Sequence, residues 1–218
     1  MLRFLLLSAA LTVFAPTVVN SQTGPWVLLH IDSAVSKNVC ATYAPPTSCA
    51  GVVSEQPAGL GLSYNVYLVT ATWGMSSYAG VGFSIHYTND PSAFSMLSWT
   101  LCGDLQFPGP GWGVAPASGS DIVITYDVIN NCQPAGSIVV NGFFYVGAYD
   151  TAVMEVRPRG ANNKLEVADC LSNEQEIPDR ISSVGFSTLG CNPCVQGCFP
   201  IPVEETTWGG VKTLFRGE

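Results

Sequence analysis

Regular alternation of large apolar residues with small or polar ones is the sequence feature that most limits how this chain can fold. In residues 79–87 (AGVGFSIHY), the side chains Val81, Phe83, Ile85 and Tyr87 recur at every second position. Successive side chains of a β-strand point to opposite faces of the sheet, so this spacing predicts a strand with one buried and one solvated face. A helix would need a period near 3.6 residues, which no long segment before residue 199 shows.

Other short segments carry strand patterns as well. They cover residues 26–31, 63–73, 94–102, 121–126, 137–145, 152–156, 164–168 and 181–187. In 63–73 (SYNVYLVTATW) both faces are largely apolar, which predicts a central strand covered on both sides. Gly and Pro make 107–113 (FPGPGWG) an irregular loop. Charged residues amount to only 11% of the chain. We therefore expect an all-β fold, a single antiparallel β-sandwich with tight loops.

The N-terminus carries the pattern of an export signal. Arg3 precedes the apolar run 4–14 (FLLLSAALTVF), which is too short to span a bilayer comfortably. Small residues before the predicted cleavage site leave Gln22 as the first residue of the mature chain. We expect a signal peptide over 1–21, a sandwich domain over 22–198 and a C-terminal tail over 199–218. No later apolar run is long enough to cross a membrane, so we expect the protein outside the cell or at its surface.

The cysteines predict disulfides. Their number is even and the expected compartment is oxidising. All of them lie after the signal: Cys40, Cys49, Cys102, Cys132, Cys170, Cys191, Cys194 and Cys198. Their order along the chain favours pairs of neighbours, namely Cys40–Cys49, Cys102–Cys132, Cys170–Cys191 and Cys194–Cys198. A redox or zinc site at the last three cysteines is disfavoured, because neither a βαβ pattern nor a histidine lies nearby.

The residues that catalysis would need form no recognisable motif. The two histidines, His30 and His86, lie within predicted strands, and the motif Gly-x-Ser-x-Gly is absent. Carboxylates near strand ends could supply the acid and base of a small glycoside hydrolase; these are Asp104, Asp121, Asp127, Asp150 and Glu155. Such pairs also arise by accident, so a non-enzymatic function is favoured and the hydrolase is kept as an alternative.

Aromatic residues in loops suggest a binding site. Trp112 lies between glycines, and Tyr43, Tyr78 and Tyr149 lie in or near loops. Exposed aromatic rings on a rigid sandwich often stack on sugars. The alternative for Trp112 is that it folds back over the core, where Gly and Pro cannot fill space.

The net charge of the chain limits the classes of binding partner that we expect. The formal net charge is −8 and no basic patch exists, so nucleic acid is not expected. Polysaccharide or a surface protein remains as the partner. No cofactor is expected, although calcium is left open by loop oxygens at 89–90, 127–131 and 162–163. Asn and Asp are equally the normal residues of turns.

Three segments resemble the cohesin-like and carbohydrate-binding β-sandwiches of secreted bacterial proteins. They are YNVYLVTATW (64–73), AGVGFSIHYTNDPSAF (79–94) and GSIVVNGFFYVG (136–147). In those families an alternating strand leads into a similar Asn/Asp-Pro turn, and a later strand returns after a glycine. The resemblance implies a sandwich fold and a binding function.

The tail resembles the ending of a group of secreted bacterial proteins. That ending has the form T-W-G-x-x-K-x-L-F/Y-R, which Thr207 to Arg216 match, and the group also carries an early cysteine pair, a central Cys-Gly-Asp and a late cysteine cluster. A recurring tail on exported proteins implies sorting or anchoring. We expect docking through Trp208, Val211, Lys212, Leu214, Phe215 and Arg216. The leading function is a secreted binding module for carbohydrate; the rival is a structural or adhesive surface protein held through this tail.

Mass spectrometry of the exported protein tests the cleavage site. We expect a mature chain that begins at Gln22, because Ser21 ends the small-residue stretch that follows the apolar run. An intact Met1 on the exported protein would contradict the predicted signal peptide.

Overall fold

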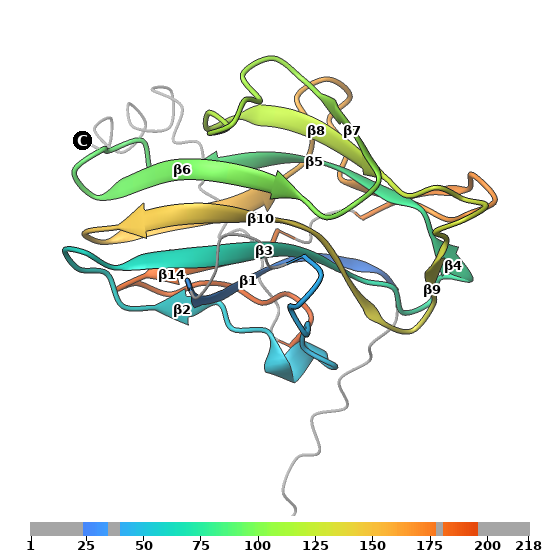
Figure 1. Cartoon of the computed structure of the whole chain (residues 1–218), viewed down its shortest axis with the longest axis horizontal. Helices are drawn as coiled ribbons and strands as arrows, with labels where there is room; N and C mark the ends of the chain where they lie inside the picture. The colour runs from blue at the N-terminus through green and yellow to red at the C-terminus, as the bar shows by residue number, and fades with distance from the viewer. Residues whose placement is uncertain (1–23, 35–39, 178–180, 196–218) are drawn as a thin grey trace, which may run out of the picture.

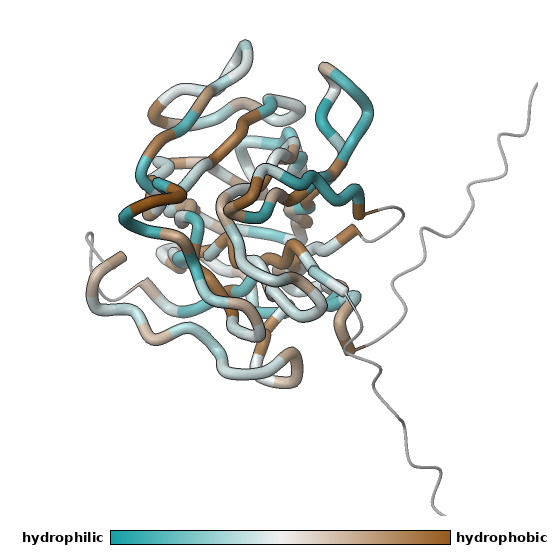
Figure 2. Tube along the Cα trace, turned by 90° about the vertical axis from the view of Figure 1, so that its right-hand side faces the viewer, coloured by the Kyte–Doolittle hydropathy of each residue, from teal (hydrophilic) through white to brown (hydrophobic). Residues whose placement is uncertain are grey.

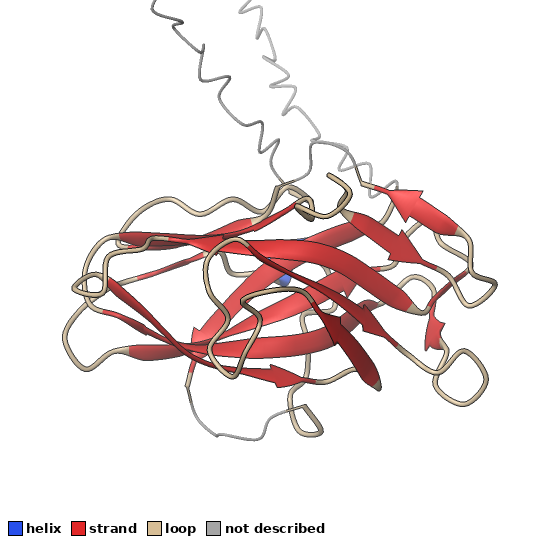
Figure 3. Ribbon diagram, turned by 90° about the horizontal axis from the view of Figure 1, so that it is seen from above, coloured by secondary structure: helices blue, strands red, loops and turns tan. Residues whose placement is uncertain are grey.

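Two β-sheets packed face to face make up most of the part of the chain that the structure describes (Figures 1 and 3). The structure, a computed structural model, describes residues 24–34, 40–177 and 181–195. The predicted signal peptide and C-terminal tail lie outside these residues. The antiparallel β-sandwich expected from the sequence is confirmed. No helix in the described ranges is long and apolar enough to cross a membrane.

The first sheet, sheet A, has four antiparallel strands. Their order is β1 (Trp26–Ser33), β3 (Ser63–Ala71), β10 (Ile138–Ala148) and β6 (Phe94–Leu101), and they form the front layer of Figure 1. Strand β3 is buried at every position from Tyr64 to Ala71, which confirms the predicted central strand. Because β3 has apolar side chains on both faces, sheet A needs cover on both sides.

The second sheet, sheet B, is larger. Its order is β13 (Glu174–Glu176), β12 (Glu166–Ala168), β5 (Gly80–Tyr87), β11 (Ala152–Arg157), β14 (Ser183–Phe186) and β2 (Glu55–Gln56). On the other side of β5 lies β8 (Ser120–Thr125), which pairs in turn with β7 (Leu105–Pro108). Strand β2 joins β14 in parallel. A two-stranded ribbon, β4 (Ser77–Tyr78) with β9 (Gln133–Pro134), lies at one end, and a short 3₁₀ turn, η1, covers Cys49–Gly51.

The predicted strands are observed with small shifts at their ends, whereas β2, β4, β7, β9 and β13 were not predicted. The longest of these is β7. Its last residues, Phe107 and Pro108, fall in the segment expected to be irregular. They pair with Val123 and Ile122 of β8. The partner strand therefore overrides the local preference of a Pro-rich stretch, and Pro is tolerated because β7 is an edge strand.

The main core lies between the two sheets. Alternate residues of the facing strands supply its side chains, and hydrophobic segments (brown) are interspersed with hydrophilic ones (teal) along the tube of Figure 2. Phe83 from sheet B and Phe144 from sheet A are fully buried there, as is Phe186. Each such side chain contributes about 1.5–3 kcal/mol of hydrophobic free energy.

A β-bulge places an amide inside this core. The register between β10 and β3 shifts between Val140 and Gly142, so Asn141 has no partner opposite it. Its side chain accepts a hydrogen bond from the Tyr78 hydroxyl at 2.5 Å and donates one to Thr70 Oγ1 at 2.9 Å. All three residues are fully buried. Tyr78, expected from the sequence to contact a ligand, is therefore a core residue, and burial raises its pKa well above the usual value.

The outer face of sheet A is partly covered by residues 40–54, which we call the flap. Beneath the flap lies a second apolar cluster that includes Leu28, Tyr67 and Val69. The Tyr43 ring stacks on the Tyr67 ring with a centroid distance of 3.7 Å. The Val53 N–H donates to His30 Nδ1 at 2.8 Å, and burial lowers the pKa of His30, which favours the neutral acceptor form.

Disulfides fix the flap and the ribbon end, in pairs that differ from those predicted. Cys40 bonds to Cys102, Cys49 to Cys194, and Cys132 to Cys170, and Cys191 is also disulfide-bonded. The predicted pairs Cys40–Cys49, Cys102–Cys132, Cys170–Cys191 and Cys194–Cys198 are therefore wrong. In a sandwich, segments far apart in sequence lie side by side, so proximity along the chain does not decide the pairing.

Removing the flap disulfide should cost more stability than removing the ribbon disulfide. The Cys49–Cys194 link closes 145 residues and Cys132–Cys170 closes 38. Loop entropy alone makes the difference about 1 kcal/mol. We expect Cys49→Ala/Cys194→Ala to lower the urea midpoint further than Cys132→Ala/Cys170→Ala, and to increase binding of a hydrophobic dye as Leu28 and Val69 become exposed. Equal midpoints and equal dye binding would contradict this role of the flap.

Candidate functional site

The part of sheet A's outer face that the flap leaves open carries two tyrosines among small polar residues. We call this surface the tyrosine face. It consists of the exposed and half-buried residues Asp32, Ser63, Ser95, Ser98, Tyr145 and Tyr149. One row of the sheet runs across all four strands, from Asp32 through Asn65 and Tyr145 to Ser98.

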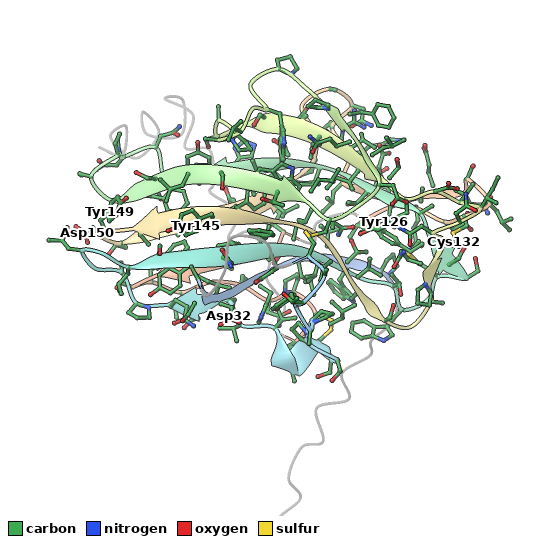
Figure 4. The ribbon with its side chains drawn as sticks, viewed as in Figure 1. Asp32, Tyr126, Cys132, Tyr145, Tyr149 and Asp150 are labelled. Atoms are coloured by element: carbon green, nitrogen blue, oxygen red, sulfur yellow. A yellow bond between two sulfur atoms is a disulfide. The ribbon has the colours of Figure 1, made fainter. Side chains whose placement is uncertain are left out.

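Tyr145 points outward because its neighbours Phe144 and Val146 belong to the core. Its side chain is half-buried, and its hydroxyl donates to Ser63 Oγ at 3.3 Å. Figure 4 shows Tyr145 in the middle of β10 and Tyr149 beyond the end of that strand. Both tyrosines therefore come from β10 or from the residue that follows it, so a rigid strand positions them.

Tyr149 folds back over the sheet at Gly147. A Cβ atom added to Gly147 would collide with the Tyr149 ring, which occupies the space of the missing side chain. A side chain at position 147 would point to the same outer face as that of Tyr145, because the two positions are two residues apart in one strand. Two aromatic rings thus occupy neighbouring positions on one flat surface, flanked by the hydroxyls of Ser63 and Ser95.

The tyrosine face has an acidic character. Asp32 is exposed on β1, and its negative charge raises the pKa of Tyr67 in addition to the larger effect of burial. The cations within the described ranges are Arg157, Arg159 and Lys164, in β11 and the loop that follows it in sheet B. No described cation therefore lies on the tyrosine face.

The structure separates the aromatic residues that the sequence grouped as a ligand site. Tyr149 is on the tyrosine face, Tyr43 belongs to the flap, Tyr78 is in the core, and Trp112 lies at the edge of the sandwich. Sequence analysis missed Tyr145, because this residue lies within a predicted strand and was considered only as a part of the sheet. Tyr145 could have been identified from the sequence as a large amphipathic ring at a solvent-facing position of an otherwise buried strand.

Trp112 closes the gap between the sheets. Its ring packs edge-on against Phe83 at 5.7 Å and Trp99 at 5.5 Å, and lies 6.0 Å from Phe144. Its buried Nε1 atom has no hydrogen-bond partner. The alternative considered for Trp112, that it folds back over the core, is the arrangement observed.

The carboxylates considered for glycoside hydrolysis hold loops and turns in place. Asp121 accepts the N–H groups of Gly160 and Ala161, each at 3.0 Å, and Asp104 accepts the N–H of Asp127 at 2.6 Å. Glu155 forms an ion pair with Arg157, and Asp150 accepts the N–H of Thr151. Hydrogen bonds from Asn130 lower the pKa of Asp127, which is opposite to what a general acid requires.

A serine and a histidine do meet on sheet B. Ser84 Oγ lies 3.2 Å from His86 Nε2, and it also donates to the Ser120 carbonyl. Ser84 is only 1% exposed, so its hydroxyl is out of reach of a substrate. The bond from Ser84 to the Ser120 carbonyl links β5 to β8, and this buried serine does not provide a nucleophile.

The loops considered for calcium form turns. The Asp90 carboxylate accepts the N–H of Ser92, Asp127 accepts that of Ile129, and Asn162 accepts that of Lys164. These are the local hydrogen bonds for which Asn and Asp are common in turns. Among the described residues, no three His, Cys, Asp or Glu side chains are grouped so that they could hold a metal ion.

No protein-family model and no curated protein matches the chain. Solved structures with a similar fold include the cohesin module of a Clostridium perfringens family 33 glycoside hydrolase, at TM-score 0.43 and 12% identity over 74% of this chain and 95% of that one. A type II cohesin domain from the Acetivibrio cellulolyticus cellulosome has a TM-score of 0.46 and 9% identity, covering 75% and 95% of the two chains. A non-cellulosomal cohesin from Archaeoglobus fulgidus has a TM-score of 0.43 and 9% identity, covering 76% and 93%.

Truncating Trp112 should destabilise the fold. We expect Trp112→Ala to lower the free energy of unfolding by about 3 kcal/mol, because it opens a cavity beside Phe83 and Trp99. Tyr145→Ala, on the open face, should cost less than about 1 kcal/mol. Chemical denaturation of both variants checks this, and equal losses would show that Trp112 does not close the sandwich.

Proposed function

We propose that this protein is a secreted, non-catalytic binding module that holds a polysaccharide chain across the tyrosine face. The observation that carries the proposal is the pair of tyrosine rings at neighbouring positions on a rigid sheet, Tyr145 and Tyr149, surrounded by hydroxyl and carboxylate groups. Secretion is supported by the apolar N-terminal run in the sequence and by the disulfides.

Sugar rings need two kinds of partner at once. Their C–H faces pack on aromatic rings, and their hydroxyl edges exchange hydrogen bonds with polar side chains. The tyrosine face offers both, since Tyr145 pairs with Ser98 on one side and its hydroxyl donates to Ser63 Oγ on the other.

The shape of this face favours a polymer over a small sugar. The exposed and half-buried side chains of this face come from all four strands of sheet A. A ligand that spans several strands gains contact area from each strand. This added area compensates for the lack of an enclosing pocket. We therefore expect weak binding to a monosaccharide and stronger binding to an insoluble chain.

An adhesive role follows from the same proposal. A module that binds a polymer without cleaving it retains the protein on a cell wall or in a matrix. A surface protein as the partner of the tyrosine face is the competing proposal, and it predicts no binding to any polysaccharide.

Binding of the mature protein to a panel of insoluble polysaccharides tests the proposal. We expect Tyr145→Ala and Tyr149→Ala each to weaken binding about tenfold, which corresponds to about 1.4 kcal/mol and is near the upper end for an aromatic contact. Pull-down isotherms on the polymers that retain the wild-type protein measure the effect.

Tyr87→Phe is the matched control, because the Tyr87 hydroxyl lies away from the tyrosine face and donates to the Pro116 carbonyl. It should bind as the wild type does. Retention of every polymer by both alanine variants, or no retention by the wild type, would refute the proposed site.

A further inference from the structure

A groove on the outer face of sheet B lies over two glycines of β5. Val81 and Phe83 point into the core, so Gly80 and Gly82 face outward, and the Arg159 side chain lies over Gly82. The groove has a volume of about 360 Å³ and is flanked by Val123 and Val128 on one side. We call it the glycine groove.

Exposed apolar residues extend the groove toward the edge of the sheet. Phe107 lies opposite Val123, which lies opposite Gly82, so one row runs from the edge strand into the groove. Phe107 is 59% exposed, Leu105 61% and Val128 47%. Large side chains exposed together in this way are typical of a surface that another segment covers.

The other side of the groove is acidic. Glu166, Asp169 and Glu174 line it together with one cation, Arg159. Arg159 Nη1 forms an ion pair with Glu166 Oε1 at 3.1 Å, so this cation is already neutralised. The groove therefore suits a segment that combines apolar side chains with unpaired Lys or Arg.

The sequence contains one segment of that kind. Residues 206–216 (TTWGGVKTLFR) combine four large apolar residues with Lys212 and Arg216 and carry no acid. The chain has eight Lys and Arg in total, and the three in the described ranges all lie between residues 157 and 164. Lys212 and Arg216 are therefore two of the five Lys and Arg residues that lie outside the described ranges.

We infer that the glycine groove is the docking site for residues 206–216 of this chain. Trp208, Leu214 and Phe215 supply apolar side chains for the row from Phe107 to Gly82, and Lys212 and Arg216 supply charge for the acidic side. This site is on the opposite sheet from the tyrosine face, so it does not depend on polysaccharide binding.

Amide hydrogen exchange of the mature, full-length protein tests this inference. We expect the amides of residues 206–216 to exchange at least about tenfold more slowly than in a synthetic peptide of the same sequence. Val123→Asp should remove the protection, since it places a charge in the row between Phe107 and Gly82. Glu174→Lys should weaken the protection, because it reverses a charge that faces Lys212 or Arg216 in the bound segment.

Matched variants separate docking from a general effect on the fold. Val153→Asp changes a half-buried, outward-facing valine of β11 in the same sheet, and Glu176→Lys changes a second acid of β13 that does not line the groove. Both should leave the protection intact. Exchange of 206–216 at the rate of the free peptide, or protection that survives Val123→Asp in a variant with an unchanged melting temperature, would overturn the inference.

Discussion

Burial of both faces of β3 is the constraint on which the rest of the structure depends. A strand that is apolar on both sides cannot face water, so sheet A must be covered twice. Sheet B covers the inner face and the flap covers half of the outer face, where Tyr43 stacks on Tyr67. The flap is mostly irregular, and the Cys49–Cys194 link holds it down. The border of the flap then defines the part of sheet A's outer face that remains uncovered.

Loops close the sides of the sandwich in the same way that the flap closes its face. The loop that carries Trp112 fills one side, and residues 52–54 bridge the other, where Val53 O accepts the Ile31 N–H and Ser54 O accepts the Gly185 N–H. The sequence of the Trp112 loop looks like that of an exposed ligand site, since Gly and Pro surround a single aromatic residue. The packing of Trp112 shows that the same composition also occurs in a loop that closes the core. The small residues let the chain turn sharply while the large ring enters the core.

Much of the fold could be predicted from the sequence, since alternation within a strand is a local property. The strands at 63–73, 79–87 and 137–145 were recognised with boundary errors of one to three residues. The disulfide pairs could not be predicted, because they depend on which distant segments meet in space. The candidate site was predicted in part: Tyr149 was named, but Tyr145 was not, because its exposure depends on where the flap ends. Strand β7 was missed because its partner β8 stabilises a stretch whose own residues disfavour a strand.

The bulge at Asn141 has a consequence for the tyrosine face. Along β10 the side chains before the bulge and after it follow two different alternations, and the extra residue is what changes one into the other. Deleting a single residue near position 141 would therefore invert the strand beyond it, turning Phe144 and Val146 toward water and Tyr145 toward the core. The amide that binds Tyr78 and Thr70 makes that inversion costly, because a slipped strand would leave three polar groups without partners inside the sandwich. The buried hydrogen bonds among Asn141, Tyr78 and Thr70 thus fix the register of β10. This register determines which residues of the strand lie on the surface.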